Sequence, residues 1–125
     1  MEKHVIQEQM RNFPGINYYP GKNKLEIAGR SIPENPEAVY KKLDSWITGH
    51  FEKNSSLNIS FELEYINSGS SKHLFEILKR LTSINRTGKR VNMKWMYEED
   101  DEAIYELGIH YRDNAGIPLD LEMVK

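Results

Sequence analysis

The chain has 125 residues, of which 38% are hydrophobic and 29% charged, and its formal net charge is −2. This composition is typical of one soluble domain with its own core, and the nearly balanced charge provides no general attraction for nucleic acid. No apolar run is long enough to cross a membrane, and the N-terminus has no apolar signal-peptide core. The absence of cysteine excludes disulfides, thiol catalysis and cysteine-ligated zinc. We therefore expect a cytoplasmic protein that binds neither membranes nor nucleic acid.

The N-terminal part of the chain is predicted to form a loose segment followed by a β-hairpin. Residues 1–12 are polar and are expected to be flexible, so that a single domain covers residues 13–125. Strands are predicted over residues 13–19 and 24–28. Between them lies the turn cluster Pro20-Gly21-Lys22-Asn23, which is typical of a hairpin connection.

Helices and strands are then predicted to alternate. Asn35 is followed by proline and glutamate, which indicates a helix start, and apolar residues recur at helical spacing over residues 39–51. Residues 57–65 alternate between apolar and polar, as a half-buried strand does. A second apolar helical stripe covers residues 74–84, and residues 91–97 alternate again.

The C-terminal part is predicted to contain one more helix and one more strand. Asp100 and Asp101 precede apolar residues at helical spacing over residues 104–115, and residues 119–123 alternate as a final strand. The predicted order is therefore β-β-α-β-α-β-α-β.

The order of the elements and the polar residues at alternate positions of each strand together predict the fold. Strands that alternate with single helices pair in parallel through right-handed crossovers, and successive crossovers in one direction place all helices on one side. We expect an α/β fold with a mixed five-stranded sheet, three helices covering one face, and Leu63, Leu78, Trp95 and Leu107 buried between the layers. The other face is expected to be open to water, because polar residues occupy its positions. They are Lys24, Glu26, Asn58, Ser60, Glu62, Glu64, Asn92, Lys94, Asp120 and Glu122.

The most distinctive segment is Tyr65-Ile66-Asn67-Ser68-Gly69-Ser70-Ser71-Lys72, which joins a predicted strand to a predicted helix. Helix starts carry unpaired N–H groups and a positive dipole, so a phosphate is stabilised there as a ligand or as a modification of serine. We expect Ser70 or Ser71 to cap this helix, which would leave Ser68 in the preceding loop. We likewise expect Asn35 to cap the first helix.

Two further segments are expected to share an edge of the sheet with this loop. The loops that follow parallel strands gather at one edge. These loops contain Arg30, Glu34 and Asn35 after one strand and the acidic residues 98–101 after another. Adjacent carboxylates at a helix start rarely converge on one ion. The histidines at positions 4, 50, 73 and 110 have no ligand spacing. We therefore expect no metal and no cofactor.

Three sequence elements resemble the family of SiaC-like bacterial regulatory phosphoproteins. Gly29-Arg30-Ser31-Ile32-Pro33-Glu34-Asn35 resembles the family's G-x-S-x-P-E-N element, and the segment from Tyr65 to Lys72 resembles its Y-x-N-[TS]-S-S motif. Trp95-Met96-Tyr97, followed by residues 98–101, resembles its third element, W-x-Y followed by charges. The resemblance extends from about residue 14 to the end. The family is similar in layout to the STAS domains of anti-sigma-factor antagonists, so the resemblance implies a STAS-like regulatory domain.

The resemblance implies a non-enzymatic switch in a partner-switching pathway. A partner protein kinase would phosphorylate Ser68, and a metal-dependent (PP2C-type) serine/threonine phosphatase would remove the phosphate. The unmodified form would bind a downstream target, such as a diguanylate cyclase that controls biofilm formation. Serine replaces the threonine of the best-known branch at position 68, and Gly69 replaces a serine, which leaves Ser70 and Ser71 as competing acceptors.

Two other interpretations of the loop stay open. One is that it only caps a helix, because serine is favoured at caps for its own hydrogen bonds. The other is a small anion-binding or enzymatic site, in which Arg30, Ser68, Ser70 and Lys72 would surround an anion. Phosphate-binding loops usually contain several glycines, whereas this one contains Gly69 alone, which favours the switch.

Overall fold

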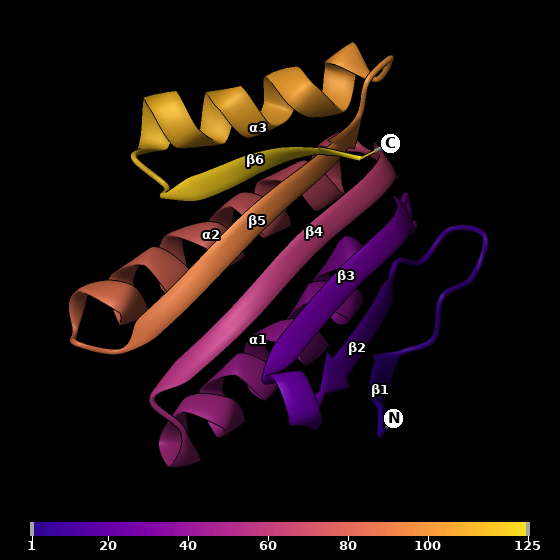
Figure 1. The fold of residues 1–125 in the computed structure, drawn as a ribbon. Helices are drawn as coiled ribbons and strands as arrows, with labels where there is room; N and C mark the ends of the chain where they lie inside the picture. The colour runs from indigo at the N-terminus through magenta and orange to yellow at the C-terminus, as the bar shows by residue number, and fades with distance from the viewer. Residues whose placement is uncertain (1, 125) are drawn as a thin grey trace.

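Six strands form one mixed sheet in the computed structural model, which describes residues 2–124 (Figure 1). A short 3-10 helix, η1, connects β2 to β3 at Pro20–Lys22. The strands are β1 (His4–Gln7), β2 (Gly15–Tyr19), β3 (Lys24–Ser31), β4 (Ser56–Ile66), β5 (Arg90–Glu98) and β6 (Leu119–Val124). The helices are α1 (Pro36–Lys53), α2 (Ser68–Arg86) and α3 (Glu102–Ala115).

The strands lie in the sheet in the same order as in the chain. The pairs β1/β2 and β2/β3 are antiparallel, whereas β3/β4, β4/β5 and β5/β6 are parallel. Each of α1, α2 and α3 therefore connects two neighbouring parallel strands, and three right-handed crossovers in one direction place the helices on the same face. Figure 1 shows α1 and α2 behind the sheet. The predicted α/β architecture is confirmed.

The structure has one strand more than the sequence predicts. Residues 4–7, which lie in the segment expected to be loose, form β1 and pair with β2 through the registers His4–Tyr18 and Val5–Asn17. These four residues therefore form a strand that the sequence does not predict, whereas the flexibility expected of residues 1–12 stays a prediction. The strand is short, its register shifts between Val5 and Gln7, and only Gln7 is buried, so no alternating pattern revealed it.

The core lies between the sheet and the helices. Leu63, Leu78 and Trp95 are buried there as expected, each no more than 4% exposed. Leu107 is only partly buried, which corrects the prediction, because it lies beside a surface groove at the end of the sheet. Trp95 packs against Phe61 on the neighbouring strand and donates its indole N–H to the carbonyl of Ile104 in α3, 2.9 Å away. This contact places α3 on the helical face with the other two helices.

The opposite face of the sheet is polar. Lys94 and Glu122 form an ion pair at 3.1 Å across β5 and β6, and Asn92 donates to Asn58 at 2.9 Å across β5 and β4. Exposed pairs of this kind add little stability, but they keep the open face hydrated. None of the three helices, within residues 2–124, combines the length and apolar character that a membrane span requires.

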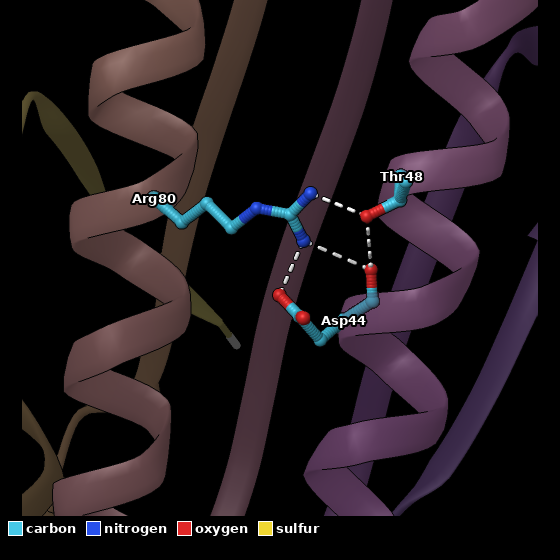
Figure 2. A network of polar contacts seen from close by, with 3 residues as sticks. All are labelled: Asp44, Thr48 and Arg80. Atoms are coloured by element: carbon cyan, nitrogen blue, oxygen red, sulfur yellow. Dashed lines mark hydrogen bonds and ion pairs between the residues drawn. The ribbon is translucent and has the colours of Figure 1, made fainter.

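One polar network joins the outer surfaces of α1 and α2 (Figure 2). The guanidinium of Arg80 donates to the carboxylate of Asp44, to its backbone carbonyl at 2.9 Å, and to the hydroxyl of Thr48. Because these side chains are partly exposed, we expect the network to orient the helices rather than to dominate their packing energy.

Stability at high pH is expected to depend on Tyr40. Its hydroxyl lies 2.8 Å from that of Ser31, and burial raises the pKa of Tyr40 to about 12. The folded protein holds this proton more tightly than the unfolded chain, so the stabilisation is complete below pH 10 and is lost as the pH rises towards about 12. In urea unfolding at increasing pH, Tyr40→Phe should show a flatter loss of stability over this range. An unchanged slope would contradict the buried environment of this hydroxyl.

Candidate functional site

The segments that follow β3 and β4 meet at the carboxyl edge of the parallel strands. The backbone N–H of Asn67 donates to the carbonyl of Ser31 at 3.0 Å, and its side-chain amide donates to the carbonyl of Pro33 at 3.3 Å. Asn67 thus joins the start of α2 to the loop that precedes α1. The geometry agrees with the expectation that these loops share one edge.

Helix α2 begins three to four residues earlier than the sequence indicates. Asn67 occupies the N-cap position, and its side-chain oxygen accepts the N–H of Ser70 at 2.8 Å. The prediction that Ser70 or Ser71 caps α2 is therefore wrong. Ser68 is the first residue of the helix rather than part of the preceding loop, so it lies directly at the positive end of the helix dipole.

The three serines of this first turn have different environments. Ser68 is exposed to solvent, whereas Ser70 is 0% exposed and its hydroxyl has no hydrogen-bond partner within residues 2–124. Ser71 is partly buried, and its hydroxyl lies 2.8 Å from the hydroxyl of Tyr111. Only Ser68 among them presents an accessible hydroxyl without an intramolecular partner in the described chain.

Asn35 marks the start of α1 but does not cap it through its side chain. It occupies the N-cap position, and Pro36 follows at the first helical position, as predicted. Its side chain makes no capping hydrogen bond, which corrects that part of the prediction. The backbone angles of Asn35 (φ −121°, ψ 83°) lie outside the range of an ideal cap, which is consistent with the missing bond.

The two asparagine positions therefore predict opposite mutational results. Asn67→Ala removes a hydrogen-bonded cap and should lower the free energy of unfolding by about 1–2 kcal/mol. Asn35→Ala removes no capping bond and should change it by less than about 0.5 kcal/mol. Urea unfolding of both variants measures the difference. Equal losses would show that the caps are assigned wrongly.

A groove of about 850 Å³ opens beside the first turn of α2. Asn67, Ser68 and Ser71 line it from α2, and residues 103, 104 and 107 line it from α3. Tyr65 and Tyr97 add aromatic surface from the ends of β4 and β5. Five carboxylates also lie along the groove, namely Glu62, Glu64, Glu98, Asp100 and Asp101. The groove is thus lined by apolar, aromatic and acidic side chains.

The remaining predicted residues lie around the groove rather than in it. The guanidinium of Arg30 lies over the exposed ring of Tyr65, 4.6 Å from its centre. Lys72 lies one helical turn beyond Ser68, and Glu34 is exposed before α1. Gly69 lies against α1, because a Cβ atom there would come within 3.2 Å of the Pro36 ring.

The structure does not gather the four residues of the anion-site alternative around one ligand. Ser70 is buried beneath the helix, and Arg30 is engaged with the Tyr65 ring. Within residues 2–124, nowhere do three or more histidine or acidic side chains converge as a metal site would require.

The sequence does not reveal the role of Tyr111. Its spacing places it only on the apolar stripe of α3, yet its hydroxyl donates to the backbone carbonyl of Ser71 at 3.0 Å. Burial raises the pKa of Tyr111, and the hydrogen bond with Ser71 partly offsets that rise. A buried tyrosine normally needs a polar partner, but the sequence does not show that this partner lies forty positions away.

Comparisons with known proteins identify the family of the chain and proteins of similar fold. The model of the SiaC family of regulatory phosphoproteins matches residues 7–124. An uncharacterized protein of Pseudomonas aeruginosa (strain UCBPP-PA14) is 25% identical over 100 residues, which are 79% of each chain.

Two solved structures from Pseudomonas aeruginosa share the fold. SiaC superposes with a TM-score of 0.85 at 22% identity, covering 99% of this chain and all of that one. A chain in the crystal structure of the diguanylate cyclase SiaD in complex with its activator SiaC superposes with a TM-score of 0.84 at 23% identity, covering 93% of this chain and 96% of that one. The family match spans nearly the whole described chain, which confirms the resemblance found in the sequence. The chain belongs to the SiaC family of regulatory phosphoproteins.

Proposed function

We propose that this chain is a non-enzymatic binding switch controlled by phosphorylation of Ser68. The observation that carries the proposal is the contrast among the three serines of the first turn of α2. A kinase can reach Ser68, whereas Ser70 is 0% exposed and Ser71 is hydrogen-bonded to Tyr111. The family is one of regulatory phosphoproteins, and the resemblance of the segment from Tyr65 to Lys72 to the family motif implies that Ser68 is the phosphoacceptor.

The start of α2 favours a phosphate on Ser68 in two ways. The helix dipole is positive there, and the ammonium of Lys72 lies one turn further along the same face. Both groups stabilise a phosphate without requiring the domain to unfold. A partner kinase would add the phosphate in the cytoplasm, and a metal-dependent serine/threonine phosphatase would remove it.

The groove beside Ser68 is the proposed docking site for a downstream target. SiaC of Pseudomonas aeruginosa is described as the activator of the diguanylate cyclase SiaD. Since this chain shares the family and the fold, we propose a diguanylate cyclase as its target. The unmodified protein would bind through the apolar part of the groove, in the partner-switching manner of STAS-domain anti-sigma-factor antagonists.

Phosphorylation would prevent this binding. A phosphate on Ser68 adds roughly −1.5 to −2 charges to a groove whose lining already includes five carboxylates. A target that packs against the unmodified first turn would have to accommodate the added bulk and desolvate a dianion, which is costly. The unmodified form is therefore the binding form.

The assignment of Ser68 is tested by mass spectrometry of protein produced in the bacterium that encodes it. The intact protein should carry one phosphate that phosphatase treatment removes, and peptide mapping should place it on Ser68. Ser68→Ala should carry none. Ser83→Ala, which removes an exposed serine at the other end of α2, should carry as much as the parent. Undiminished phosphate on Ser68→Ala would move the site to another hydroxyl and refute the assignment.

A further inference from the structure

The hydroxyl of Tyr111 ties α3 to the first turn of α2. It donates to the carbonyl oxygen of Ser71 at 3.0 Å and lies 2.8 Å from the hydroxyl oxygen of the same residue. Because the proton of Tyr111 is used on the carbonyl, the hydroxyl of Ser71 donates its own proton to the Tyr111 oxygen. No other side-chain hydrogen bond joins these two helices in the described part of the chain.

The ring of Tyr111 is held independently of its hydroxyl. It meets the indole of Trp95 edge-on, with ring centres 5.7 Å apart, and stacks on Phe75 at the same distance. The side chain is 3% exposed. Removing the hydroxyl alone should therefore leave the ring in place and break only the tie to Ser71.

The hydrogen bonds of Tyr111 join the two helices that line the groove beside Ser68. Ser68 and Ser71 line the groove from α2, and Ile104 and Leu107 line it from α3. The position of α3 relative to the first turn of α2 therefore sets the shape of the groove. Tyr111 is the side chain that links these two sides by hydrogen bonds.

A phosphate on Ser68 would compete with Tyr111 for the hydrogen bond that the Ser71 hydroxyl donates. Ser68 and Ser71 are separated by three positions in α2, so their Cβ atoms lie about 5–6 Å apart on one face of the helix. Phosphate oxygens are strong hydrogen-bond acceptors and can accept the hydrogen bond that the Ser71 hydroxyl otherwise donates to Tyr111. Tyr111 then keeps only its bond to the carbonyl, and α3 is held less firmly.

We infer that Tyr111 is the positioning residue that transmits the modification state of Ser68 to α3 and so to the opposite side of the groove. The inference rests on the proposed function and adds a route by which the phosphate alters the target surface beyond its own bulk. It concerns the C-terminal half of α3, where Tyr111 lies. The acidic N-terminal end of α3 would respond to the added charge directly.

The test uses phosphoserine incorporated at position 68 by an expanded genetic code and measures amide hydrogen exchange in residues 108–115. Phosphorylation should accelerate exchange there about fivefold, the effect of weakening one hydrogen bond. In Tyr111→Phe, exchange should already be fast and should not change on phosphorylation. Ser71→Ala keeps the bond from Tyr111 to the backbone carbonyl, so it should exchange about as fast as the phosphorylated parent and should not change on phosphorylation. Adding Ser71→Ala to Tyr111→Phe should change nothing further.

Tyr40→Phe is the matched control. Tyr40 is also 3% exposed, and its hydroxyl also lies 2.8 Å from a serine hydroxyl, that of Ser31, but it lies on α1. This variant should keep the full response of α3 to phosphorylation. A full response in Tyr111→Phe, or no response in the parent, would overturn the inference. The proposed function fails separately, if target binding is the same with and without the phosphate.

Discussion

Gly108→Ala is expected to lower the free energy of unfolding by about 2–3 kcal/mol, as overpacking of a well-packed core does. Gly108 is buried on α3 directly against the indole of Trp95. A Cβ atom there would lie 2.7 Å from the indole nitrogen and still closer to the neighbouring ring carbon. The ring cannot withdraw easily, because its N–H is bonded to the carbonyl of Ile104 and the side chain is 1% exposed.

Gly49→Ala provides the matched control for this prediction. Gly49 lies within α1 and is exposed, and a Cβ atom added there would have open space for 4 Å around it. Alanine is favoured over glycine in a helix, so this variant should be more stable by about 0.5–1 kcal/mol. Thermal unfolding should show a decrease of roughly 10 °C for Gly108→Ala and a small increase for Gly49→Ala. Unchanged stability of Gly108→Ala would contradict the packing of α3 on Trp95.

The second large effect concerns target binding in the presence of the kinase. Ser68→Ala should stay bound to the target when kinase and ATP are added, because it has no acceptor hydroxyl at this position. The parent should be released under the same conditions. Ser68→Asp should bind weakly without any kinase, since one carboxylate imitates part of the phosphate charge.

Substitutions at Ser83 serve as controls for the same helix. Ser83→Ala and Ser83→Asp change an exposed residue near the opposite end of α2, so both should behave as the parent does. Gel filtration of mixtures with the target separates bound from free protein. Release of Ser68→Ala by the kinase would show that another residue controls binding.

The sequence predicts the strands that carry a clear alternation and misses the one that does not. In β4, Leu57, Ile59, Phe61 and Leu63 are all buried, so the period-two pattern directly reflects the covered face of the sheet. In β1, by contrast, only Gln7 is buried, and an edge strand of four residues has little pattern to read. The pairing of β1 depends on where β2 lies in space, and the local sequence of residues 4–7 carries no information on that.

The site could be predicted only in part, because its details depend on distant partners. Asn67, Ser68, Ser70 and Ser71 can each cap a helix, and local preference does not distinguish among them. Asn67 is held in the cap position by a second hydrogen bond of its side chain, which donates to the carbonyl of Pro33 on another segment. The burial of Ser70 likewise follows from the packing of α2 on the rest of the fold. The family motif indicates this turn, and tertiary contacts decide which of its three serine hydroxyls is exposed.

The most direct test of the switch is the affinity of one purified diguanylate cyclase, from the same bacterium, for two forms of this protein. One form carries phosphoserine at position 68, and the other is the same preparation after phosphatase treatment. We expect the unmodified form to bind at least about a hundredfold more tightly, since leaving a charge desolvated and unpaired costs about 3 kcal/mol or more. Equal affinity of the two forms would contradict a phosphorylation-controlled binding switch.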